Sequence, residues 1–104
     1  MTMARLIVST LPDVNSVAAF VASAEGVPKA GLELSNFKVR KAEPGADGAF
    51  LVVSEVEASP LRGFYRLNLS PLESGIRRKG LYVFDLVVQK DGDSGQTVSS
   101  VIMT

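Results

Sequence analysis

The sequence predicts an all-β fold, a sandwich of about seven antiparallel strands in a single domain over residues 1–104. Short runs of β-branched, aliphatic and aromatic residues recur along the chain at a spacing of about ten residues, and Gly, Pro, Asp or Ser residues separate them. The run Gly80–Lys90 is apolar in both strand registers, which is typical of a central strand whose second face is covered. No segment shows a convincing long helical pattern.

Each expected strand begins or ends at a turn signal. The expected strands are Ala4–Leu11, Ser16–Ala24, Phe37–Lys41, Phe50–Ala58, Gly63–Ser70, Gly80–Lys90 and Gln96–Met103. The last two are expected to form a hairpin across the turn Asp91–Gly95.

Ser16–Ala24 is the ambiguous segment. Its alanines favour a helix, and its larger apolar residues recur at helical spacing. A strand would instead place Val17, Ala19 and Val21 on one face. Because Gly26 follows at once, as it does after a sandwich strand, we favour the strand, with one short helix as the alternative.

The expected core follows from strand alternation. One register of Gly80–Lys90 puts Tyr82, Phe84, Leu86 and Val88 on a single face. We expect these side chains to be buried between the sheets together with Phe37, Val39, Leu67, Leu69 and Ile102.

The other register of the same strand gives a candidate interaction face, Leu81, Val83, Asp85 and Val87. A large contiguous apolar patch on the surface of a monomer usually marks an interaction site. A formal net charge of zero also gives little electrostatic repulsion between copies of the chain. We therefore expect association with a protein partner or with a second copy, as a two-fold homodimer. The alternative is that the N-terminal segment or residues 72–79 cover this face within one chain.

Composition limits the chemistry. Eleven basic residues balance eleven acidic ones, so the chain lacks the positive field that nucleic-acid binding needs. Without histidine or cysteine, the commonest general base and the thiolate ligands are missing, and there is no Gly-x-Ser-x-Gly motif or phosphate-binding glycine loop. We expect no enzymatic activity and no cofactor. No apolar run approaches the roughly 20 residues of a membrane helix, so no membrane partner is expected.

Three charged groups could still bind a ligand. Asp91 and Asp93 superficially resemble a calcium loop, but Gly95 replaces the third oxygen ligand and no glutamate follows, so a plain hairpin turn is favoured over a weak cation site. The basic loop Arg77, Arg78 and Lys79 could hold a phosphate, a sulfated glycan or an acidic protein patch, although three charges usually mark a solvated loop. Asp85 is expected to face solvent, to lie across from a basic residue, or to be buried at an interface.

Several short motifs resemble bacterial immunoglobulin-like modules. They are Gly26-Val27-Pro28, Gly31-Leu32, Asn36-Phe37-Lys38-Val39, Gly63-Phe64-Tyr65 and Gly80-x-Tyr82-x-Phe84, and they extend roughly over residues 16–103. Transthyretin-like and carboxypeptidase-regulatory-like modules are nearly as similar. The immunoglobulin resemblance implies that Tyr82 is the corner tyrosine, whose hydroxyl bonds to upstream backbone, and that Phe84 stands where antibody domains have a disulfide cysteine.

The expected function is that of a non-enzymatic protein-interaction or structural module, acting through a sheet face in an oligomer or larger assembly. The alternative is a carbohydrate- or cation-binding sandwich, which two or three coplanar exposed aromatic rings on one sheet face would favour. If the chain is complete as given, a cytoplasmic location is expected, and an extracellular one if it is part of a longer secreted protein.

Overall fold

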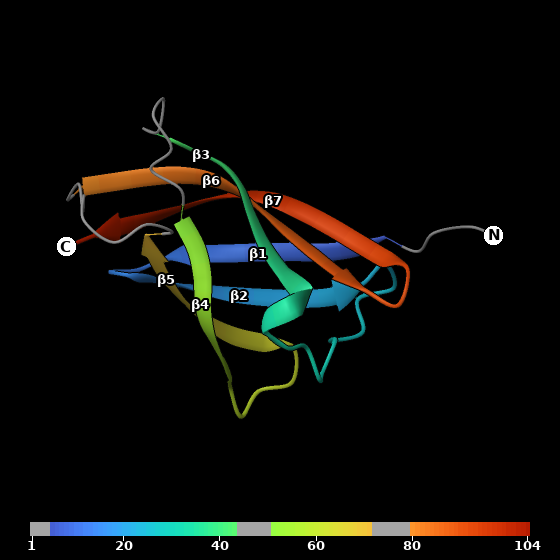
Figure 1. The fold of residues 1–104 in the computed structure, drawn as a ribbon. Coiled ribbons are helices and arrows are strands. Elements are labelled where there is room, and N and C mark those ends of the chain that lie inside the picture. Colours follow the sequence, from blue (N-terminus) through green and yellow to red (C-terminus); the bar gives the residue numbers. More distant parts are fainter. Residues whose placement is uncertain (1–4, 44–50, 72–79) are drawn as a thin grey trace.

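The structure, a computed structural model, describes residues 5–43, 51–71 and 80–104 and shows an all-β fold. Its strands are β1 Leu6–Pro12, β2 Ser16–Ser23, β3 Phe37–Glu43, β4 Leu51–Ala58, β5 Phe64–Pro71, β6 Gly80–Lys90 and β7 Asp93–Met103, with a 3₁₀ turn η1 at Leu34–Asn36. They form two antiparallel sheets, β1-β2-β5-β4 and β3-β6-β7, packed face to face (Figure 1). The predicted all-β sandwich is confirmed. Within these ranges no helix is long and apolar enough to cross a membrane.

The ambiguous segment is the strand β2. It lies between β1 and β5 and pairs antiparallel with both. Val17, Ala19 and Val21 are buried at 0, 1 and 0% exposure, as strand alternation requires. Pairing on both edges outweighs the modest helix propensity of the alanines.

The core lies between the two sheets. Tyr82, Phe84, Leu86 and Val88 of β6 are buried there, together with Phe37 of β3 and Leu67 and Leu69 of β5, as predicted. Val39 is half-buried and packs against this cluster. The prediction for Ile102 is wrong, because its side chain is 45% exposed while its neighbours Val101 and Met103 point inward.

The hairpin between β6 and β7 is tighter than expected. Asp91 and Gly92 alone form the turn, with φ of 52° and 86°, and Lys90 pairs with Asp93. Positive φ at both central residues is the mark of a type I′ turn, whose twist matches that of the flanking strands. Asp93 and Gly95 therefore belong to β7 rather than to the turn.

In the described part of the chain, the two sides of the sandwich differ in how their strands are paired. Strand β1 lies along β7, with parallel bridges from Arg5 to Ser94 and from Val14 to Ile102 (Figure 1). On the opposite side, β3 and β4 contact one another, and among the described residues each has a single hydrogen-bonded neighbour strand. We call this second side the open side.

Residues 24–36 connect β2 of one sheet to β3 of the other, and polar contacts bind this connection to both sheets. The hydroxyl of buried Tyr65 on β5 donates to the Lys29 carbonyl at 2.6 Å and accepts from the Leu32 N–H at 3.2 Å. A bond from a tyrosine hydroxyl to upstream backbone is the kind that the family resemblance implies for Tyr82, and Tyr65 makes one here.

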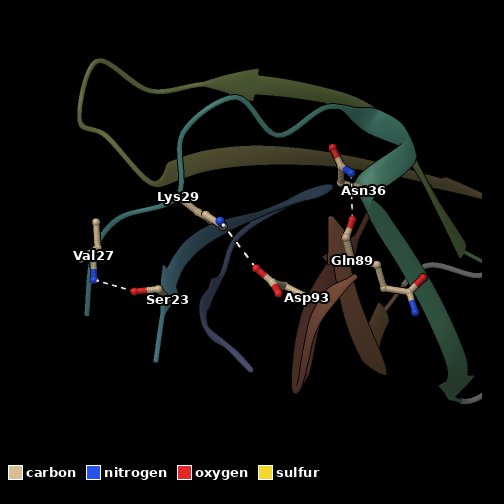
Figure 2. A network of polar contacts seen from close by, with 6 residues as sticks. All are labelled: Ser23, Val27, Lys29, Asn36, Gln89 and Asp93. Atoms are coloured by element: carbon tan, nitrogen blue, oxygen red, sulfur yellow. Dashed lines mark hydrogen bonds and ion pairs between the residues drawn. The ribbon is translucent and has the colours of Figure 1, made fainter. Parts of the chain in front are cut away.

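The same connection is tied to the β6–β7 hairpin by polar contacts. The Lys29 ammonium lies 3.7 Å from the Asp93 carboxylate, and the Asn36 side-chain amide donates to the Gln89 carbonyl at 2.8 Å (Figure 2). Lys90 Nζ also donates to the Gly31 carbonyl, at 3.0 Å. These contacts hold one end of the sheet β3-β6-β7 in place.

Candidate interaction surface

An apolar surface lies on the outer face of the sheet β3-β6-β7. The register places Leu81 of β6 directly opposite Ile102 of β7, and Val14 bridges to Ile102 from the other side. Val83 lies two residues along β6, and Val98 lies opposite Asp85. We call the set Val14, Leu81, Val83, Val98 and Ile102 the apolar face; its members are 46, 59, 41, 68 and 45% exposed.

Two of the four predicted interaction residues are exposed members of this face. Leu81 and Val83 point outward as the alternation of β6 requires. Val87 faces the same side but is only 6% exposed, so it adds nothing accessible. It lies between Lys38 on β3 and Gln96 on β7, whose long side chains can cover it.

Asp85 is half-buried and lies directly across from Arg40 of β3. This position fits the expectation of a basic residue opposite the carboxylate. Opposite charges at directly facing positions stabilise a sheet modestly. Asp85 therefore sits at the boundary between the apolar face and the charged edge strand β3.

Three members of the apolar face were not found from the sequence. Strand alternation predicts Ile102 in the core, no local pattern assigns Val98 to a face, and Val14 lies in the turn between β1 and β2. Their grouping depends on how β7 is registered against β6 and on the bridge from β1, neither of which a local pattern specifies.

The acidic candidates lie at the hairpin. Asp93 pairs with Lys29, and Asp91 is exposed in the turn itself. In the described part of the chain there is no group of three or more acidic, histidine or cysteine residues that could hold a metal ion. The basic loop Arg77, Arg78 and Lys79 lies outside the described residues.

The outer face of the other sheet carries an aromatic pair. Phe20 of β2 and Phe64 of β5 are directly opposite, with ring centroids 4.6 Å apart and planes tilted by 42°. The rings line a shallow groove with Ser9, Thr10, Leu11, Ala18 and Ala19. Because the rings are tilted, they do not form the flat platform on which a sugar ring would stack.

Comparisons of this chain with protein-family models, with curated proteins and with solved structures find no match.

Proposed function

We propose that this chain is a non-enzymatic protein-interaction module that associates with a second copy of itself through the apolar face, as part of an oligomer. The observation that carries the proposal is the contiguity of five exposed aliphatic side chains across β6, β7 and the β1–β2 turn. Large exposed apolar patches mark interaction sites. A patch that meets its own copy does so across a two-fold axis.

The strand order supports an immunoglobulin-like assignment as part of this proposal. The first, second, fifth and fourth strands form one sheet, and the third, sixth and seventh form the other. Constant-type immunoglobulin domains have this division of strands. Because that fold hosts many functions, the proposed role rests on the apolar face and not on the fold.

The free energy available from burying the apolar face is large enough for a stable dimer. Fully burying a Val or Leu side chain is worth roughly 1.5–3 kcal/mol. Association costs about 4–15 kcal/mol in lost freedom of motion. With five half-exposed side chains from each copy, the apolar face can offset that cost. The carbohydrate-binding alternative has weaker support, because the aromatic pair Phe20–Phe64 is tilted.

A matched pair of substitutions tests the face. Ile102 and Ile7 are both 45% exposed, Ile102 on the apolar face and Ile7 on the outer face of the other sheet. Burying an unpaired ammonium at an interface is strongly unfavourable. Ile102→Lys should therefore lower the particle mass measured by light scattering at concentrations where Ile7→Lys leaves it unchanged. Equal masses for wild type and both variants would contradict the proposal.

A further inference from the structure

The two strands of the open side, β3 and β4, are the edge strands of their sheets, and each has backbone groups that no described strand pairs with. In the described part of the chain, β3 pairs only with β6 and β4 only with β5, so one edge of each has N–H and C=O groups without a strand partner. Both strands are irregular at one point, between Arg40 and Glu43 in β3 and between Val53 and Glu55 in β4. Bulges of this kind restrict edge pairing. The longest regular stretch of each strand is residues 37–40 in β3 and residues 55–58 in β4.

These two stretches carry opposite charge. Lys38 and Arg40 of β3 are exposed, and so are Glu55 and Glu57 of β4. Like charges directly opposite each other destabilise a strand pair, and opposite charges stabilise it. Pairing of β3 with another β3, or of β4 with another β4, is therefore disfavoured. Pairing of β3 with the β4 of another copy is favoured.

Two residues at the rim of the described core lie on the open side. Val39 on β3 and Val56 on β4 are half-buried and pack against the core cluster. Each lies between the two charged residues of its own stretch and faces inward. A strand added to either edge would cover the exposed part of these side chains.

We infer that a second copy of this chain docks on the open side, with β3 of each copy paired antiparallel to β4 of the other. Pairing residues 37–40 with residues 58–55 puts Val39 opposite Val56. In the same register Lys38 lies opposite Glu57 and Arg40 opposite Glu55. A two-fold axis makes this contact twice, so complementary charges meet in both strand pairs of the interface.

The strand directions allow this arrangement. All described strand pairs within the two sheets are antiparallel. Because β1 also runs parallel to β7, β3 and β4 of one chain run in opposite directions. A two-fold axis along the strands on the open side preserves these directions. It places the sheet β3-β6-β7 of one copy in line with the sheet β1-β2-β5-β4 of the other, and β3 then meets β4 antiparallel.

The inference is independent of the proposed function and adds a second interface to it. In the edge-paired dimer the two apolar faces point to opposite sides, since the axis exchanges the two layers. A particle that uses both interfaces is larger than a dimer. The apolar face and the open side can therefore be tested separately.

The test starts from the variant Ile102→Lys, which removes the apolar face as a contact. With the open side intact, sedimentation or light scattering should give about 22 kDa, twice the 11.0 kDa of one chain, at protein concentrations up to about 1 mM. A mass of 11.0 kDa over that whole range would overturn the inference. If the wild-type particle has a larger mass than this variant, the same result would still support association through the apolar face.

Charge-reversal variants then test whether β3 and β4 are the strands that pair in the dimer. In this background, Lys38→Glu with Arg40→Glu should give a monomer, and so should Glu55→Lys with Glu57→Lys, because each places like charges opposite each other. Mixing the two double variants should restore the dimer, because each then meets a complementary edge. Glu25→Lys, an exposed reversal in the connection between β2 and β3, is the control and should leave the dimer intact.

Circular dichroism checks that each variant is folded. Arg40 lies opposite Asp85 and Glu57 opposite Arg66 within one chain, so the double variants lose favourable neighbours. The single variants Lys38→Glu and Glu55→Lys face the uncharged residues Val87 and Asn68. Glu55→Lys gives up only an exposed hydrogen bond from the Asn68 amide, so each single variant should weaken the dimer without unfolding the chain. Dimers that persist in all reversed variants, or mixtures that stay monomeric, would overturn the inference.

Discussion

Two hydrogen bonds join Asn15 to Thr104. Asn15 Nδ2 donates to Thr104 Oγ1 at 2.9 Å, and the Thr104 backbone N–H donates to Asn15 Oδ1 at 3.1 Å. The backbone of Asn15 also donates to the Ile102 carbonyl at 2.8 Å and accepts from the Leu69 N–H at 3.0 Å. One residue in a turn thus joins β7 to β5, next to the bridge between Val14 and Ile102 of the apolar face.

Asn15→Gly and Asn15→Ala should separate the side-chain bonds from the backbone conformation. Asn15 has φ of 56°, which Gly adopts freely and Ala adopts at a cost of about 1–2 kcal/mol. Gly should lose roughly 1–2 kcal/mol through the two side-chain bonds, and Ala more than Gly. Urea unfolding gives both free energies. Variants of equal stability would show that the left-handed turn is not retained.

Phe84→Ala tests the register of β6. Phe84 is 1% exposed in the centre of the core, and its removal should lower the unfolding free energy by about 3–5 kcal/mol. Ile102→Ala is the control on the outer face of β7 and should cost less than Phe84→Ala, because its side chain is 45% exposed. Overlapping denaturant curves for Phe84→Ala and wild type would show that Phe84 is not a core residue.

The fold class could be predicted because strand runs and turn signals are local, whereas the apolar face depends on one register. A turn over Asp91–Gly95 would pair Gln96 with Lys90 and bring Ile102 opposite Phe84, facing the core. The two-residue turn at Asp91 and Gly92 pairs Asp93 with Lys90 instead. This moves β7 by three residues, and an odd shift exchanges the faces of a strand. Ile102 consequently lies opposite Leu81, on the surface.

The open side could not be predicted from the sequence for a different reason. The charges of Lys38, Arg40, Glu55 and Glu57 are visible in the sequence, but their position on edge strands depends on which strands pair. Strand order is a property of the whole chain, because β2 pairs with β5 and β3 pairs with β6, strands that lie far apart in the sequence. Local patterning therefore predicts the strands but not the edges.

Tyr65→Phe should loosen the connection between β2 and β3. The substitution removes the hydroxyl that bonds the Lys29 carbonyl and the Leu32 N–H. Leaving buried or half-buried backbone groups without a partner costs about 1–3 kcal/mol. We expect this loss in urea unfolding, together with faster hydrogen exchange at the Leu32 amide. Unchanged exchange at that amide would contradict the proposed anchoring role of the hydroxyl.

Ser99→Ala should raise stability. Ser99 is 5% exposed on the inward side of β7, and its Oγ has no hydrogen-bond partner in the described part of the chain. A buried hydroxyl without a partner costs about 1–3 kcal/mol, and the alanine removes only that group. We expect an increase of about 1 kcal/mol in the unfolding free energy. Ser100→Ala, at the neighbouring outward position, should change it by less than about 0.5 kcal/mol.

The turn residues Asp91 and Gly92 allow the hairpin and the cation site to be distinguished. Gly92 has φ of 86°, so Gly92→Ala should lower the unfolding free energy by about 1–2 kcal/mol. Asp91→Asn keeps a residue that type I′ turns favour and should leave stability nearly unchanged. It also removes a carboxylate that a calcium ion would need. The melting temperatures of wild type and Asp91→Asn should therefore stay equal with and without added calcium. A rise with calcium in wild type alone would show that Asp91 and Asp93 bind the cation.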